Sequence, residues 1–199
     1  MGDLTELYQQ DIADFPVAAV TEPAMQPRPE LGLQATDAYF NAGVLLINRL
    51  KWQEQQVSER AIAFLEKNHQ VAPYADQDAL NATLVGNWQE LNPRFNLMSI
   101  YIPAGMSSQE VEVFLRDKVV IHFTHATKPW HSLCENRLRF LYYKYLRLSP
   151  MRKNSRPIDF KINRKLLWSI AKIKGWEWYY DYPIIPLASL NKLRALLKK

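Results

Sequence analysis

The sequence predicts an α/β fold, because two kinds of segment alternate along the chain. Short apolar runs occur at residues 17–20, 44–47 and 119–123, and each leads into a polar or Pro-containing segment, which is typical of buried strands. Residues 51–68 instead repeat apolar side chains every three or four positions, which predicts a helix with one buried face. We therefore expect a sheet flanked by helices.

The composition narrows the class of protein. With 199 residues, of which 48% are hydrophobic and 12% aromatic, the chain can form one substantial core, and intrinsic disorder is excluded. No run of about 18 apolar residues occurs, so we expect no membrane span. The acidic N-terminus has the wrong charge for a signal peptide, and the single Cys134 excludes an internal disulfide. Both features predict a cytoplasmic protein.

The first third of the chain contains a candidate ligand loop. Residues 2–8 predict a short helical turn, and residues 23–36, with three prolines and a glycine, predict a loop that is unusually long unless it is functional. Residues 44–47 are apolar enough for a central strand. Asn41, Ala42 and Gly43 precede that strand, and small residues there would let a ligand approach the backbone. A turn with an internally hydrogen-bonded Asn41 is the alternative.

A second candidate lies at the start of a helix after Pro73. Asp76 is predicted to cap this helix, and Asp78 lies in its first turn, where the helix dipole favours a carboxylate. Alternatively, Asp76 and Gln77 present a carboxylate and an amide to a sugar or a cation. The preceding helix, residues 51–68, is expected to bury a face made of Val57, Ala61, Phe64 and Leu65.

Further elements follow from local signals. Residues 88–91 predict a strand and residues 92–96 a turn, and residues 107–110 form a capping box that opens a helix through residue 116. Residues 135–147 predict another helix. Its expected apolar face contains Leu138, Leu141, Tyr142 and Tyr145.

The polar turn after residues 119–123 concentrates the reactive side chains. Residues 119–131 together hold three of the four histidines. His122 is predicted within the strand, and His125 and Lys128 in the loop at its C-terminal end, the edge where open α/β sheets bind ligands. An imidazole can ligate a metal, and a lysine can neutralise a phosphate. A core histidine and a solvated lysine are the alternative. Pro129 and Trp130 are expected to lock the turn.

The C-terminal segment differs in charge from the rest of the chain. Residues 152–199 carry twelve Lys/Arg and three Asp/Glu, whereas residues 1–151 carry thirteen Lys/Arg and seventeen Asp/Glu. The segment is also rich in Trp and Tyr. It predicts an amphipathic basic helix that either lies on an anionic membrane surface or packs on the domain as a helical cap.

Several common enzyme signatures are absent from the sequence. There is no P-loop, no Gly-rich dinucleotide fingerprint, no Cys-based zinc site and no Gly-x-Ser-x-Gly elbow. A metal-dependent hydrolase would need three or more converging ligands. Its candidate ligands are Asp76, His122, His125 and His131.

Several separated motifs occur in the order and rough spacing of one family. They are Tyr-Phe-Asn-Ala-Gly-Val-Leu-Leu-Ile-Asn at residues 39–48, Asp-Gln-Asp-Ala-Leu-Asn at 76–81, Arg-Phe-Asn at 94–96, Ile-His-Phe at 121–123 and Lys-Pro-Trp-His at 128–131. With residues 2–8 and 17–20, they resemble glycosyltransferase family 8, in particular the bacterial lipopolysaccharide α-galactosyl- and α-glucosyltransferases. The resemblance extends from residue 2 to about residue 147.

This resemblance implies a GT-A fold, a mixed sheet flanked by helices, and transfer of galactose or glucose from a UDP-sugar with retention of configuration. It implies Mn²⁺ or Mg²⁺ as the cofactor, a lipid-linked oligosaccharide acceptor in lipopolysaccharide synthesis, and no nucleic acid partner. The protein would be cytoplasmic, peripheral on the inner face of the bacterial inner membrane. The implied roles are metal ligand for His122, donor binding for Asn41, Ala42, Gly43, His125 and Lys128, and catalysis for Asp76 and Gln77.

The sequence departs from the family pattern at three places. His125 stands where the family often has glycine, and Thr21 and Glu22 stand where it commonly has an aspartate. The family's Asp-x-Asp motif, which supplies the other cation ligands, would precede residue 2. We therefore expect residues 1–148 to be the C-terminal part of a catalytic domain with impaired activity, followed by a tail at 149–199. A non-catalytic sugar-binding or partner module is the alternative.

Overall fold

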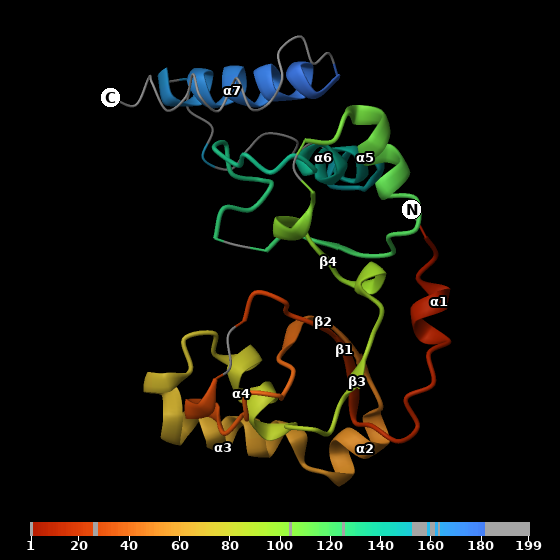
Figure 1. The fold of residues 1–199 in the computed structure, drawn as a ribbon, viewed down its shortest axis with the longest axis vertical. Coiled ribbons are helices and arrows are strands. Elements are labelled where there is room, and N and C mark those ends of the chain that lie inside the picture. Colours follow the sequence, from red (N-terminus) through yellow and green to blue (C-terminus); the bar gives the residue numbers. More distant parts are fainter. Residues whose placement is uncertain are drawn as a thin grey trace. The chain divides into compact units, whose positions relative to one another are not determined.

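The computed structural model describes residues 2–25, 28–103, 105–124, 126–152, 159, 162 and 164–181 (Figure 1). The chain forms two compact units. The first contains Met1–Met98 and Asp117–His122, and the second contains Ser99–Arg116 and Phe123–Lys199. The predicted boundary between a catalytic part ending at residue 148 and a tail beginning at 149 stays a prediction.

The first unit is built on a mixed sheet, as predicted. Strand β1 (Val17–Thr21) lies between β2 (Phe40–Ile47), which is antiparallel to it, and β3 (Gln89–Glu90), which is parallel. A second pair, β4 (Leu97–Met98) and β5 (Ile121–His122), is parallel. The predicted N-terminal helical turn is confirmed as α1 (Thr5–Tyr8).

The prediction that residues 44–47 form a central strand is wrong for the described residues. There β2 pairs only with β1, and Ile47 is 47% exposed. The central strand is β1, which has a strand on each side. Its residues Val17, Ala18 and Ala19 have no solvent exposure, and Val17 and Ala19 belong to a core cluster. The apolar composition of residues 44–47 reflects partial burial of one face by Trp52 and other core side chains, not a central position.

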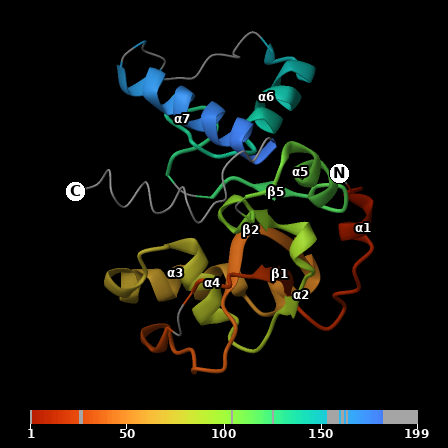
Figure 2. The same cartoon turned by 45° about the horizontal axis from the view of Figure 1, so that its top comes forward.

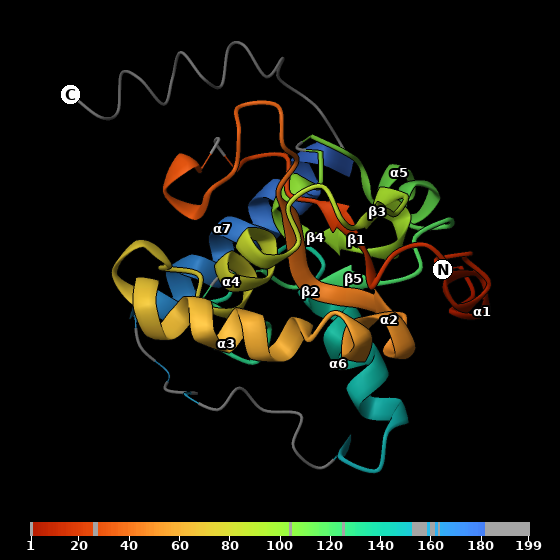
Figure 3. The same ribbon diagram turned by 90° about the horizontal axis from the view of Figure 1, so that it is seen from below.

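Two helices replace the single helix predicted for residues 51–68. They are α2 (Arg49–Glu54) and α3 (Val57–Asn68), and the chain turns between them at Gln56, which has a φ of 49°. Helix α3 lies beside α4 (Asp76–Thr83), as Figure 1 and Figure 3 show. The predicted burial of Val57 and Ala61 is confirmed, and Val57 joins a core cluster. The fully buried members of that cluster are Val17, Ala19, Phe40, Val57 and Leu84.

Short 3-10 turns connect these elements. The predicted turn at residues 92–96 is confirmed, because Asn92 accepts a hydrogen bond from the backbone N–H of Arg94. The predicted long loop at residues 23–36 contains another such turn. The four 3-10 segments of the described residues are Pro29–Leu31, His69–Val71, Pro93–Phe95 and Ser99–Tyr101.

A buried charge holds the long loop against α4. Asp78 has no solvent exposure and accepts hydrogen bonds from Arg28 at 3.0 Å, the Tyr39 hydroxyl at 2.7 Å and the backbone N–H of Tyr74 at 2.8 Å. Burial and the bond to Asp78 raise the pKa of Tyr39. Burial opposes the charge of Arg28, but Glu30 and Asp78 outweigh it and raise its pKa. Asp78 therefore ties the described part of the long loop to the start of α4.

The described part of the second unit contains the α-helices α5, α6 and α7, which Figure 2 labels. The predicted capping box is confirmed at Ser107 and Glu110, which begin α5 (Ser108–Phe114). Helix α6 (Arg139–Leu148) begins four residues later than predicted because Asn136 accepts a hydrogen bond from Leu138 and keeps the chain in a turn. Helix α7 (Arg164–Asp181) contacts α5. Within the described ranges, no helix is both long enough and apolar enough to span a bilayer.

Replacing Asp78 by Ala is expected to lower the free energy of unfolding by about 3–5 kcal/mol, because Arg28 would keep its buried charge without this partner. Asp76→Ala, two residues upstream at an exposed position, is the matched control and should change it by no more than about 0.5 kcal/mol. Urea unfolding followed by circular dichroism measures both. Equal losses of unfolding free energy in the two variants would contradict the conclusion that the buried Asp78 carboxylate stabilises the fold.

Candidate functional site

A bulge in β2 forms the centre of the candidate site. Ala19 pairs with Leu45 and the next residue, Val20, pairs with Asn41, so residues 42–44 have no partners on β1. The freed backbone groups bond elsewhere: the Ala42 N–H donates to Gln77 Oε1 at 3.0 Å, and the Gly43 N–H donates to Asn41 Oδ1 at 3.0 Å. A bulge bends a strand and re-aims its residues, often beside an active site. The predicted donor-binding residues therefore lie in one irregular segment of backbone.

Helix α4 is fastened to this segment by one buried amide. Asn81 accepts a hydrogen bond from the Phe40 N–H at 2.8 Å and donates to Phe40 O at 2.9 Å and Gln77 O at 2.8 Å. Its side chain is 2% exposed. The two predicted catalytic residues, at the first two positions of α4, are thereby placed beside the bulge, which brings Gln77 to Ala42.

The start of α4 differs from the prediction. Asp76 is not the N-cap; that position belongs to Ala75, which makes no side-chain cap bond and has a φ of 44° and a ψ of −109°. A positive φ in a non-glycine residue is strained and persists only where surrounding contacts enforce it. The result is an exposed Asp76 carboxylate at the N-terminus of α4, with Gln77 half-buried behind it.

Two further polar residues lie at the bulge, and sequence reasoning did not assign either of them to the site. Asn96, 1% exposed, donates to Asn41 Oδ1 at 2.9 Å, and Asn41 donates to Glu22 Oε2 at 3.0 Å. The position of each residue in the sequence could have indicated a place in the site: Asn96 ends the Arg-Phe-Asn motif, and Glu22 directly follows β1. They hold the Asn41 side chain from both sides.

His122 lies directly over Gly43. It belongs to β5 and pairs with Met98, which confirms the prediction that His122 lies within a strand. A Cβ atom added to Gly43 would lie 2.0 Å from His122 Cε1, far inside van der Waals contact. Gly43 is therefore required by the imidazole ring, and the predicted metal ligand and the predicted donor loop are in contact.

Lys128 belongs to the second unit and is described within it. Its ammonium donates to Phe123 O at 2.7 Å, and its backbone N–H donates to His131 Nδ1 at 3.0 Å. Pro129 is fully buried and its carbonyl accepts from Arg139 Nε at 2.9 Å, in keeping with the predicted lock. The predicted donor-binding residue His125 lies outside the described residues.

The residues that the structure describes do not by themselves make a complete site for a divalent cation. Among the described residues, no group of three or more His, Cys, Asp or Glu side chains could hold a metal ion. His122 is a nitrogen ligand of the type that Mn²⁺ accepts, but oxygen ligands dominate such sites. For the alternative hydrolase site, His131 already uses Nδ1 to accept the Lys128 N–H.

Residues 1–134 match the family model described as Glycosyl transferase family 8. The chain belongs to glycosyltransferase family 8. It is 31% identical over 155 residues, 73% of the chain, to General stress protein A of Bacillus subtilis, and 32% identical over 208 residues, 99% of the chain, to a putative glycosyltransferase of Haemophilus influenzae. The chain covers 54% and 55% of these relatives, about half their length.

Other relatives of this family 8 chain carry more specific names. A lipopolysaccharide 1,2-glucosyltransferase of Escherichia coli K12 is 28% identical over 142 residues, covering 66% of the chain and 41% of the relative. Among solved structures, the galactosyltransferase LgtC in complex with donor and acceptor sugar analogs matches with a TM-score of 0.60 at 24% identity, covering 85% of this chain and 61% of that one. Apo GlyE of Streptococcus pneumoniae matches with a TM-score of 0.55 at 27% identity, covering 78% of this chain and 38% of that one. The predicted GT-A fold is confirmed.

Replacing Gly43 by Ala is expected to displace the His122 ring and lower the free energy of unfolding by about 1–3 kcal/mol, because the new methyl group has no room. Chemical denaturation and the NMR signals of His122 measure the two effects. Gly175→Ala is the matched control. It lies in α7 with nothing within 4 Å of the added Cβ, so it should stabilise by up to about 1 kcal/mol. Unchanged His122 signals in Gly43→Ala would contradict the contact.

Proposed function

We propose that this chain forms the sugar-binding and catalytic part of a retaining hexosyltransferase, which moves galactose or glucose from a UDP-sugar to a lipopolysaccharide or oligosaccharide acceptor. Family membership supports glycosyl transfer, and the names of the lipopolysaccharide glucosyltransferase and of LgtC support the hexose and the acceptor class. The single observation that carries the proposal is the hydrogen bond from Ala42 to Gln77, because it joins the predicted donor loop to the predicted catalytic helix.

The residues of the first unit have distinct roles in this proposal. The small side chain of Ala42 lets the hexose approach the backbone, and Gly43 keeps the His122 ring beside this segment. Asn41, fixed by Asn96 and Glu22, keeps one amide N–H to donate to a sugar hydroxyl.

Gln77 is held through Oε1, which accepts a hydrogen bond from the Ala42 N–H at 3.0 Å. A neutral amide so held is a weak nucleophile. It suits a front-face displacement with ion-pair character, in which it positions the sugar.

Asp76 has a different role from Gln77. Its exposed carboxylate, beside the same helix terminus, can stabilise positive charge that develops at the anomeric carbon. It also keeps open a covalent glycosyl–enzyme route, in which the carboxylate would act as the nucleophile. We propose His122 as a protein ligand of Mn²⁺ or Mg²⁺, and Lys128 and His125 as contacts to the diphosphate. A bound cation would neutralise the departing UDP.

Donor binding is the primary test of the proposed function. Titration calorimetry with UDP-glucose or UDP-galactose and Mn²⁺ should detect binding. Asn41→Ala and Gln77→Ala should each weaken it about tenfold or more, since each removes hydrogen bonds to the sugar or its loop. Glu59→Gln, at an exposed site on α3, is the control and should leave binding unchanged.

Two results would count against the proposed function. A folded chain that binds neither UDP-sugar would support the non-catalytic module instead. Donor binding that survives both substitutions would place the donor somewhere other than the bulge.

We also propose that α7 contacts a membrane surface, which would place the protein peripherally at the inner face of the inner membrane, beside a lipid-linked acceptor. One side of α7 packs within the second unit, where Leu166 is 4% and Ser169 6% exposed. Leu167, Trp168 and Trp178 are 58%, 73% and 54% exposed. Basic residues accompany them along the helix, and this combination binds anionic lipid interfaces. Basic residues of α7 are Arg164, Lys165, Lys172 and Lys174.

Co-sedimentation with phosphatidylglycerol vesicles tests this contact. The double variant Trp168→Ser, Trp178→Ser should bind about tenfold or more weakly, because it removes two interfacial aromatic anchors. Leu148→Ser is the matched control: Leu148 is an exposed apolar residue of α6, and its loss should have little effect. Equal binding by the double variant and the intact chain would remove the proposal.

A further inference from the structure

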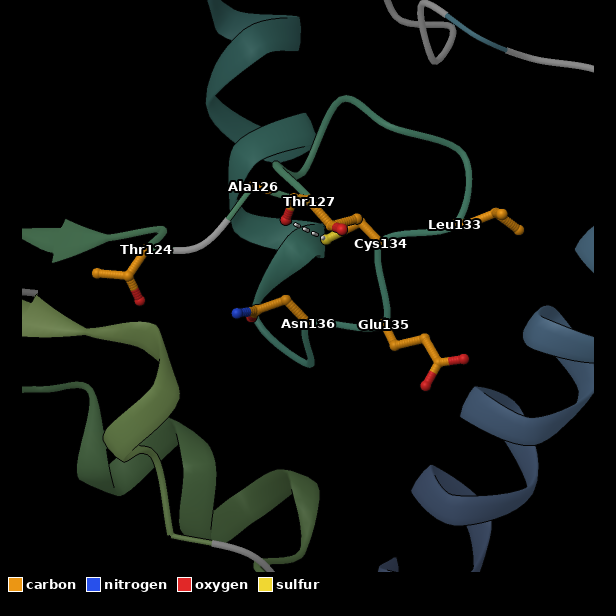
Figure 4. A pocket seen from close by; sticks show the side chains of 7 residues that line it. All are labelled: Thr124, Ala126, Thr127, Leu133, Cys134, Glu135 and Asn136. Atoms are coloured by element: carbon orange, nitrogen blue, oxygen red, sulfur yellow. Dashed lines mark hydrogen bonds between the residues drawn. The ribbon is translucent and has the colours of Figure 1, made fainter. Parts of the chain in front are cut away.

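The second unit contains a pocket that none of the roles above uses. Its volume is about 490 Å³, within the range of roughly 300–1,000 Å³ that small-molecule sites occupy. The loop that follows β5 forms one wall and the segment that precedes α6 forms the other (Figure 4). The residues that line it are Thr124, Ala126, Thr127, Leu133, Cys134, Glu135 and Asn136.

Two polar groups on facing sides of the pocket have unused hydrogen-bonding capacity. Thr124 Oγ1 is buried and has no hydrogen-bond partner among the described residues. Asn136 uses Oδ1 to accept the Leu138 N–H at 2.9 Å, which leaves its amide N–H groups as donors. Figure 4 shows the Asn136 amide directed across the space towards the side on which Thr124 lies. A buried polar atom without a partner is unfavourable by about 1–3 kcal/mol, which a ligand could recover.

The charge of the pocket selects against ionic ligands. None of the lining residues that the structure describes is a lysine or an arginine, so these residues offer no counter-ion to a phosphate or carboxylate. Its one carboxylate, Glu135, is paired with Lys172 of α7. Two threonine hydroxyls and an amide remain as hydrogen-bonding groups, and Ala126, Leu133 and Cys134 supply apolar surface. A sugar ring matches this lining, because it combines neutral hydroxyl groups with C–H faces.

We propose that this pocket binds a neutral sugar residue of the oligosaccharide acceptor, held by Thr124 and Asn136. The assignment to the acceptor rests on the proposed transferase function; the preference for a neutral saccharide rests on the pocket. Asn136 is bonded to the backbone at the start of α6 and Glu135 to α7, so the wall that holds the sugar is anchored to both helices.

Saturation-transfer NMR and chemical-shift titration of the intact chain with maltose, cellobiose and melibiose test the proposal. At least one disaccharide should bind. Thr124→Val removes the hydroxyl at constant shape, and Asn136→Asp keeps the acceptor for Leu138 while it removes the amide donors. Each should weaken binding about tenfold or more. Gln109→Glu, an amide-to-acid change at an exposed site on α5, should leave binding unchanged.

The possible results separate the pocket from the transferase function. Disaccharide binding that depends on Thr124 and Asn136 supports the pocket even if no UDP-sugar binds, a result that would refute only the assignment to an acceptor. If a UDP-sugar binds but no disaccharide binds at concentrations of tens of millimolar, the proposal for the pocket is wrong and the transferase proposal is unaffected. The proposal for the pocket is also wrong if both variants unfold at the same temperature as the parent chain and bind the saccharide with unchanged affinity. Tighter binding of glucose 6-phosphate than of glucose would contradict the neutral-ligand preference.

Discussion

The hydrogen bonds between the Asn81 side chain and both backbone groups of Phe40 are the contact on which the first unit's site depends. They join the first two turns of α4 to the strand immediately before its bulge. Because the bulge removes residues 42–44 from the ladder, their polar groups need other partners. Gln77, on the fastened helix, supplies one of them. Without Asn81, both the helix terminus and the irregular strand would lose the partner that holds each in place.

The site at the bulge is built mainly from neutral amides. Asn41 and Asn81 each donate and accept through their side chains, Asn96 donates and Gln77 accepts, so the segment is fixed largely by neutral groups. The buried ionic pair of Arg28 and Asp78 is used elsewhere, to tie the long loop to α4. In the proposed transferase, this division would suit a neutral hexose, whose hydroxyl groups need directional partners, and would leave the exposed Asp76 to stabilise charge at the reacting carbon.

Local signals in the sequence predicted β1, the buried face of α3, the capping box of α5 and the candidate residues Asn41, Gly43 and His122. The errors have physical causes. Apolar residues 44–47 resemble a central strand because the helices bury one face of an edge strand, and Asp76 resembles an N-cap because nothing in the sequence reveals the positive φ of Ala75. Asn96 lies 55 positions from its partner Asn41 in the sequence, so only the fold could bring them together.

The contact between Gly43 and His122 gives a different reason for the glycine at the bulge from the one predicted. Its lack of a side chain was expected to make room for a ligand, but the imidazole occupies that space. The ring orientation of His122 is therefore set by the same backbone segment that would hold the sugar. In the second unit, the ammonium of Lys128 rests on a neutral carbonyl, that of Phe123. An ionised phosphate oxygen is a stronger acceptor than a carbonyl, so a diphosphate would displace this contact without unfolding the turn, which Pro129 and His131 hold independently.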